Sequence, residues 1–149
     1  MAKNRLMLGT FLPYRLSIAS NAVSDVIAGA YRSLFGLSVP EWRLVTVLAE
    51  QEQATQNELG AATRMDKVTV SRAAIALVER GLVTRAANPG DRRSHLLALS
   101  GSGRELYGEV APKALALETE LLAGFCAEER AALMAMLARL EEAAAGMDG

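Results

Sequence analysis

One segment of the sequence carries basic and small side chains at spacings that suit contact with the bases of DNA. In a helix, Val68 and Arg72 lie one turn apart on the same face, and Thr69 and Ser71 flank that face. The Arg72 guanidinium can donate two parallel hydrogen bonds to guanine O6 and N7, and the Val68 methyl groups can contact a thymine methyl. Thr69 and Ser71 can bond phosphate or base edges, whereas Lys67 is expected to bind phosphate, which sets position without reading sequence. The alternative interpretation is an ordinary solvated helix face.

A second basic group follows a turn. Turn-forming residues at 88–90 precede Asp91, Arg92 and Arg93, which predicts a hairpin with a basic tip. A thin hairpin can place the Arg93 guanidinium in the minor groove of DNA, where the potential is most negative. Arg92 is expected to meet phosphate. Alternatively, the tip is merely solvated, and an ion pair there contributes little stability.

Charge is unevenly distributed along the 149 residues, although the formal net charge is only −1. Residues 54–104 carry eight basic and four acidic side chains, net +4, whereas residues 1–53 carry +1 and residues 105–149 carry −6. A basic middle between less basic flanks is typical of a nucleic-acid-binding module within a larger body. The 51% hydrophobic content excludes a disordered chain, and only 5% aromatic residues favours helices built from Ala, Leu, Val and Met.

Catalytic and metal chemistry lack the residues they need. Cys126 and His95 are the only cysteine and histidine, which excludes a disulfide framework and a zinc site built on either residue type. No nucleophile, base and orienting group can be assembled around them, so we expect no enzyme, no cofactor and no metal. Cys126 is expected to be a buried structural thiol, with redox sensing as the alternative. His95 is expected to be a strand residue near solvent, or else a phosphate contact.

No apolar run reaches the length that spans a membrane. The basic and apolar N-terminus lacks a clean cleavage site for secretion. These two features favour a reduced, cytoplasmic protein.

The basic helix is expected to be the second half of a helix-turn-helix. Asp66 is a good N-cap for a helix over 67–80, which a glycine then ends. A shorter helix over 56–62 precedes it after a tight turn, and two such helices form the helix-turn-helix pattern. The basic tip belongs to a hairpin whose strands are expected over 82–85 and 94–99.

The start of the 56–62 helix carries a capping box. The Thr55 hydroxyl can accept a hydrogen bond from the Glu58 amide while the Glu58 carboxylate accepts one from Thr55. Thr55, Gln56 and Asn57 at this helix start can also approach a phosphate.

Helices are expected elsewhere over 13–35, from Ser38 as N-cap to Glu50, over 102–122 and over 127–145. Pro112 should kink or split the third of these, and Gly146 should end the last. The outer helices carry apolar stripes that must be buried in each other or in another subunit. The fold class is therefore mainly α with a small β-hairpin wing: a winged helix-turn-helix with N- and C-terminal helices.

Two stretches give the sequence a family resemblance. The wing reads Asn-Pro-Gly-Asp-Arg-Arg-Ser at 88–94 and is followed by Leu99, Ser100 and Gly103. This resembles the Asp-x-Arg wing and the Leu-Thr/Ser-x-x-Gly step of the MarR family of transcriptional regulators (multiple-antibiotic-resistance regulator type). The segments 65–72 and 78–83 are also typical of its recognition helix.

The resemblance implies one MarR-like domain over 1–149 that acts as an obligate homodimer. The dimerisation helices would lie at about 10–36 and 102–146, and the winged-helix lobe at about 38–101 would bind a pseudo-palindromic operator in double-stranded DNA. The family pattern implies that Asp91 orients Arg93. It also implies small aromatic or phenolic effectors, often anionic.

The effector site is not fixed by the sequence. Tyr31 and Trp42 are candidates to line it, with core packing as the alternative. The function favoured at this stage is a ligand-responsive repressor. The alternatives are an activator, a DNA binder without sequence preference, a protein-interaction module that has lost operator binding, and a redox-sensing regulator that uses Cys126.

Overall fold

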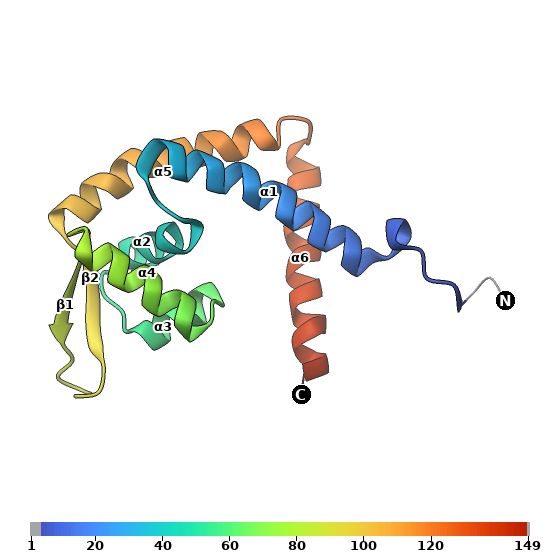
Figure 1. Ribbon diagram of the computed structural model, residues 1–149. Helices are drawn as coiled ribbons and strands as arrows, with labels where there is room; N and C mark the ends of the chain where they lie inside the picture. The colour runs from blue at the N-terminus through green and yellow to red at the C-terminus, as the bar shows by residue number, and fades with distance from the viewer. Residues whose placement is uncertain (1–3, 149) are drawn as a thin grey trace. The chain divides into compact units, whose positions relative to one another are not determined.

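The computed structural model describes residues 4–148, which form a mainly helical fold with one two-stranded sheet (Figure 1). In chain order the elements are the 3₁₀ helix η2 (Leu8–Thr10), α1 (Leu12–Phe35), α2 (Val39–Gln51), α3 (Gln56–Thr63), α4 (Lys67–Glu79), β1 (Val83–Ala87), β2 (His95–Leu99), α5 (Gly101–Leu121) and α6 (Ala127–Asp148). This order confirms the predicted fold class. The first compact unit ends at Val110 and the second begins at Ala111, both within α5.

Side-chain caps define where α2 and α3 begin. Ser38 Oγ accepts from the Glu41 amide at 3.2 Å, and the Glu41 carboxylate accepts from the Ser38 amide at 2.8 Å. Thr55 and Glu58 make the same reciprocal pair at 3.2 and 3.1 Å. The Thr55–Glu58 capping box and the Ser38 N-cap are as predicted, and each reciprocal pair satisfies two helix-end donors that have no partner within the helix.

The core of the first unit lies where α2, α3 and α4 meet the base of the hairpin. The α4 residues Val70, Ala74 and Leu77 are buried as expected, whereas Val78 is only half-buried. They pack with other apolar side chains that are all less than a tenth exposed: Leu37, Leu44, Val45, Leu48, Leu59, Ala73, Leu82, Val83, Leu97 and Leu99. Each fully buried leucine or valine stabilises the fold by about 1.5–3 kcal/mol relative to exposure. This core fixes α4 so that its opposite face points outward.

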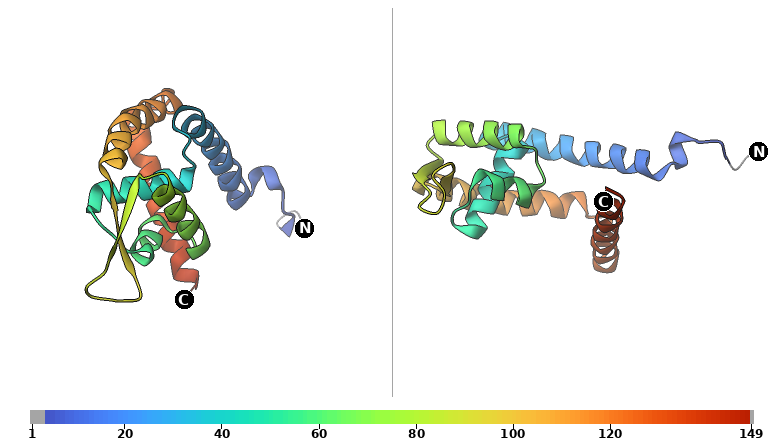
Figure 2. Two further views of the ribbon diagram at one scale, coloured as in Figure 1. Left: turned by 60° about the vertical axis from the view of Figure 1, so that its left-hand side comes forward. Right: turned by 90° about the horizontal axis from the view of Figure 1, so that it is seen from below.

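The hairpin is longer in its first strand than the sequence indicates. β1 and β2 pair in antiparallel register with Val83 opposite Leu99, Arg85 opposite Leu97, and Ala87 opposite His95. The strands twist about each other and their turn projects from the helices (Figure 2). The expected strand over 82–85 misses the two alanines at its end, because alanine has little strand propensity and the pairing across the hairpin places them there.

A third segment joins the sheet where the sequence predicts none. The Ala54 amide donates to the Leu97 carbonyl at 3.0 Å, and the Leu97 amide donates to the Ala54 carbonyl at 2.8 Å. This bridge holds the start of α3 against the wing.

Three expectations for the C-terminal part are corrected. Pro112 lies inside α5 without splitting the helix. α6 continues through Gly146 to Asp148, because a glycine near a helix end weakens the helix by only about 1 kcal/mol. Cys126 is exposed rather than buried, since it precedes α6 and its amide donates to Glu129 Oε1 at 2.9 Å.

Among residues 4–148, none of the helices combines the length and the apolar character needed to cross a membrane.

Candidate nucleic-acid interface

The outward face of α4 carries the predicted contact residues. Lys67, Val68 and Arg72 are exposed, and Val68 is 59% exposed, which is high for an apolar side chain on a short helix. Ile75 extends this face: it is 48% exposed, lies three residues after Arg72, and was missed by the sequence analysis. Its helical spacing from Val68 and Arg72 was the available signal. The face therefore combines two cations with two apolar groups that have no cover in the first unit.

Thr69 and Ser71 are only half-buried, and Thr69 is already engaged. Its amide donates to Asp66 Oδ1 at 2.8 Å and its hydroxyl donates to Asp66 Oδ2 at 2.9 Å. These hydrogen bonds hold the pKa of the Asp66 carboxyl below its ordinary value, the backbone contribution being the largest. Thr69 therefore supports the N-cap of α4. Its hydroxyl oxygen can still accept a hydrogen bond, but its proton is already donated to Asp66.

The wing tip is held by its own side chains. The Asn88 side-chain amide donates to Ser94 Oγ at 2.9 Å, and its oxygen accepts from the Gly90 amide at 3.1 Å. The Asp91 carboxylate accepts from the backbone N–H of Arg93 at 2.9 Å. Asp91 therefore constrains Arg93 through its main chain and leaves the guanidinium at the surface.

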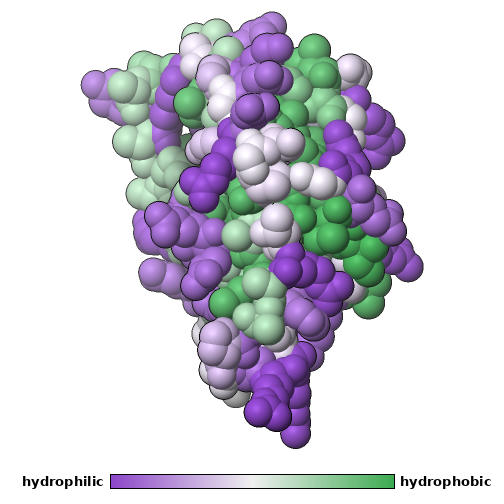
Figure 3. Space-filling view, turned by 90° about the vertical axis from the view of Figure 1, so that its left-hand side faces the viewer, coloured by the Kyte–Doolittle hydropathy of each residue, from purple (hydrophilic) through white to green (hydrophobic). Residues whose placement is uncertain are grey.

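Arg92 and Arg93 are both exposed at this tip. In the space-filling view, the projecting end of the wing is covered by hydrophilic side chains (Figure 3).

Arg85 on β1 was not among the predicted site residues. Its Nη2 lies 3.2 Å from His95 Nδ1 on β2. Arg85 is opposite Leu97, two residues from His95, so the two side chains share one face of the hairpin on a diagonal. His95 is exposed, as expected for a strand residue near solvent. A signal for the pair appears only once the strand register is known.

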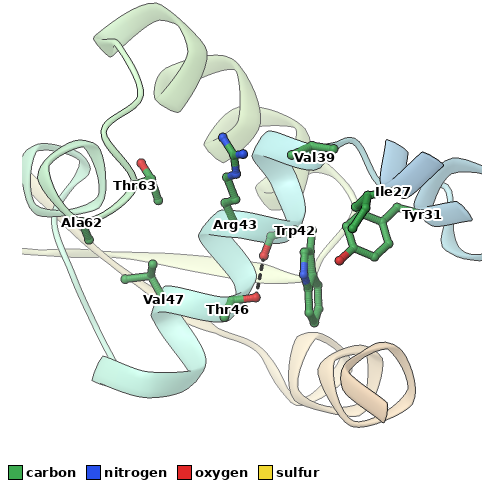
Figure 4. A pocket seen from close by; sticks show the side chains of 9 residues that line it. All are labelled: Ile27, Tyr31, Val39, Trp42, Arg43, Thr46, Val47, Ala62 and Thr63. Atoms are coloured by element: carbon green, nitrogen blue, oxygen red, sulfur yellow. Dashed lines mark hydrogen bonds between the residues drawn. The ribbon is translucent and has the colours of Figure 1, made fainter. Parts of the chain in front are cut away.

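An apolar pocket of about 430 Å³ lies between α1, α2 and α3 (Figure 4). Tyr31 and Trp42 lie together at one end with ring centroids 5.6 Å apart, Ala62 and Thr63 line the other end, and Arg43 lies between. Trp42 also stacks on Tyr107 of α5 at 5.7 Å. Burial raises the pKa of the Tyr31 hydroxyl, an effect that the nearby Arg43 charge partly offsets.

Tyr31 and Trp42 therefore line a pocket and also pack in an aromatic cluster. That an effector binds there stays a prediction.

The α4 face and the wing tip belong to the same compact unit. Within residues 4–148, no group of three or more His, Cys, Asp or Glu side chains is placed to hold a metal ion. The arrangement is that of a winged helix-turn-helix protein with exposed cationic side chains on α4 and at the wing tip.

Comparison with known proteins identifies the family. The sequence profile described as "MarR family" matches residues 35–94. The uncharacterised HTH-type transcriptional regulator YdgJ of Bacillus subtilis (strain 168) is 30% identical over 118 residues, covering 79% of this chain and 72% of YdgJ. This chain therefore belongs to the MarR family, whose members are transcriptional regulators and not enzymes.

Solved structures agree with this assignment. The crystal structure of a probable transcriptional regulator from Pseudomonas aeruginosa is 32% identical, with a TM-score of 0.79 over 90% of this chain and 99% of that one. BpsR of Bordetella bronchiseptica, described by its regulation of DNA binding by 6-hydroxynicotinic acid, shares the fold at 22% identity, with a TM-score of 0.85 over 93% of this chain and 98% of that one.

Proposed function

We propose that this chain regulates transcription as a homodimer that binds a pseudo-palindromic operator in double-stranded DNA, with repression released by a small ligand. The observation that carries the proposal is the pairing, in one unit, of an exposed cationic face on α4 with an exposed arginine tip on the wing. A helix of this kind fits the major groove while a thin hairpin reaches the adjacent minor groove.

Each residue has a distinct role in this proposal. Arg72 and Val68 read base edges, and Lys67 positions α4 on phosphate. Arg93 enters the minor groove and Arg92 meets phosphate. Thr69 and Ser71 flank the reading face as hydrogen-bond partners, and Asp91 fixes the wing backbone beneath Arg93.

The test is selection of bound duplexes from a random DNA library at about 150 mM salt, where non-specific binding is weak. Wild type should enrich a two-fold-related site. Arg72→Ala should lose discrimination at one base pair per half-site, worth about 1–3 kcal/mol, and Arg93→Ala should blunt preference in flanking A·T-rich positions. Arg32→Ala, which removes an exposed arginine on α1, is the matched control and should select the wild-type site. Absence of enrichment with refolded, ligand-free protein would contradict the proposal.

Homodimerisation is supported by apolar side chains that the single chain leaves in water. On α6 they recur at helical spacing as Leu133, Met136, Leu137 and Leu140, which are 37–51% exposed. On α1 the corresponding exposed residues are Leu12, Leu16, Val23 and Val26. Stripes of this extent on two helices are typical of a subunit interface.

Sedimentation velocity tests the dimer. Wild type should sediment as a dimer and Leu137→Glu as a monomer, because a buried carboxylate at that stripe is unpaired. Ala135→Glu places the same charge on the opposite side of α6 and should remain dimeric. If Leu137→Glu sediments like wild type, the interface lies elsewhere.

The pocket between α1, α2 and α3 supports ligand control. Aromatic rings at one end and the Arg43 cation between the two ends suit a small aromatic acid, the class to which the BpsR ligand belongs. By linkage, a ligand that releases DNA must bind the free dimer more tightly than the DNA-bound dimer.

Trp42 is the only tryptophan, so the tryptophan fluorescence reports on this pocket and on the adjoining stack with Tyr107. Titration with 6-hydroxynicotinate and 2-hydroxybenzoate should quench it saturably and lower operator affinity. The Arg43→Gln variant should weaken the binding of either acid. A panel of aromatic acids that leaves both fluorescence and operator affinity unchanged would contradict ligand control through this pocket.

A further inference from the structure

A second pocket, of about 350 Å³, lies between the wing and the start of α3. Its polar lining includes Arg85, Arg93 and His95 from the wing and the side chains of Gln56 and Asn57 from α3. We propose that this pocket binds a single phosphodiester group of the DNA backbone, with Arg85 as its principal ligand. The inference rests on the proposed operator binding and adds to it a residue and a site.

The hairpin register explains why these side chains converge. One face of the hairpin carries Val83 and Leu99 at its base, followed by Arg85 opposite Leu97. Val83, Leu97 and Leu99 are buried, whereas Arg85 and the diagonal His95 are exposed. The face that packs on the core therefore becomes polar where the strands leave it. The Ala54–Leu97 bridge holds that point against the start of α3.

The contact between Arg85 and His95 indicates which nitrogen of the imidazole accepts a hydrogen bond. A guanidinium has donors and no acceptor, so His95 Nδ1 accepts the hydrogen bond at 3.2 Å. In that tautomer the Nε2–H group is a second donor beside the guanidinium. Arg85 retains four further N–H donors for the planar, two-oxygen recognition that phosphate favours.

The charge of the lining distinguishes this pocket from its neighbours. The groove between α3 and α4 includes Asp66, and the groove at the start of α2 includes Glu41. The residues that line the wing pocket include two arginines, a histidine and two side-chain amides, with no carboxylate among them. An anion is therefore the ligand that this lining accepts, and a backbone phosphate is the anion that a DNA-bound wing meets.

Phosphate binding here predicts a specific signature. Arg85→Ala should lower affinity for the selected operator about tenfold and reduce the slope of log K against log salt by about one phosphate contact, with base preference unchanged. Arg85→Lys keeps the positive charge but loses the planar guanidinium that can bind two phosphate oxygens. Its affinity should therefore lie between those of Arg85→Ala and wild type. Arg32→Ala is the control for loss of an exposed arginine outside the pocket. Circular dichroism spectra should be identical across the set, because Arg85 is exposed.

Neutral methylphosphonate linkages, placed one at a time along the operator, provide the decisive experiment. Several linkages should weaken wild type, because Lys67 and Arg92 are also proposed to meet phosphate. At one position in each half-site the neutral linkage should weaken wild type about tenfold and have no further effect on Arg85→Ala. Arg32→Ala should respond like wild type. If every linkage weakens wild type and Arg85→Ala equally, the pocket binds no phosphate, although operator binding itself stands. If wild type fails to bind any duplex, the proposed function and this site fail together.

Discussion

Gly103 lies where α5 begins against the base of the wing, and its replacement by alanine tests how that junction is built. A Cβ added at Gly103 would lie 2.1 Å from the Leu82 carbonyl oxygen and 3.2 Å from Leu99 Cδ2. Ordinary contact begins at 3.4 Å, so the backbone must separate by about 1.3 Å, and no flexible side chain can absorb the change. The same Leu82 carbonyl accepts the Ser100 amide at 3.0 Å.

The free energy of unfolding should fall by about 3 kcal/mol in Gly103→Ala. Overpacking against backbone contributes about 3 kcal/mol and the loss of the Ser100–Leu82 hydrogen bond about 1 kcal/mol, while alanine improves helix propensity by about 1 kcal/mol. Gly108→Ala is the matched control: it lies in the same helix with open space around its Cβ, and it should stabilise by about 1 kcal/mol.

Urea unfolding at one fixed protein concentration, followed by circular dichroism, measures both variants, because the stability of a dimer depends on concentration. A Gly103→Ala variant within about 0.5 kcal/mol of wild type would refute the close approach of α5 to Leu82.

Three further predictions concern a turn, a cap and a thiol. Glu52 has φ 67° and ψ −45°, and the Gln53 amide donates to the Gln51 carbonyl at 2.7 Å around it. This is a strained γ-turn, so Glu52→Gly should stabilise by about 0.5–1 kcal/mol whereas Gln51→Gly, in the last turn of α2, should destabilise; equal effects in urea unfolding would contradict the turn. Because the folded-state pKa of Asp66 is lowered, its contribution to stability is present above the ordinary carboxyl pKa and is lost as pH falls through the lowered value. Asp66→Asn keeps an N-cap, so the difference in urea midpoint between it and wild type should shrink on acidification from pH 7 to about 3, and a constant difference would be inconsistent with the cap. Cys126 is exposed, so a thiol reagent such as 5,5′-dithiobis(2-nitrobenzoate) should modify it in native protein; reaction only after denaturation would show that the thiol is covered.

The starts of α2, α3 and α4 were predictable because each is fixed by residues three positions apart. Ser38 with Glu41, Thr55 with Glu58, and Asp66 with Thr69 form their bonds within one helical turn. The residues that a helix exposes opposite its buried face follow from the same geometry, which is why the outward face of α4 could be named from spacing alone. Their contacts with DNA remain predictions.

The ends of helices in the second unit were harder to predict. A single proline or glycine destabilises a helix less than a long run of good helix formers stabilises it. α5 continues through Pro112 because alanine, leucine and glutamate on both sides favour the helix, and α6 continues through Gly146 because a run of glutamate and alanine precedes it. The exposure of Cys126 was missed for a related reason: the burial that is usual for a thiol says little about a position that begins a helix.

The wing pocket required information that no local pattern contains. In the sequence, Arg85 looks like any other surface arginine, and only the strand register places it diagonal to His95. That register is anchored by the pairing of Leu97 with Ala54, which lies forty-three residues earlier in the chain. Slipping the hairpin by one residue would turn Arg85 to the opposite face and expose Leu97. The burial of Leu97 therefore does two things at once: it stabilises the base of the wing and it aims Arg85 and His95 toward α3. A proposed contact residue on a strand is thus positioned by its apolar neighbour, whereas one on α4 is positioned by its own helix.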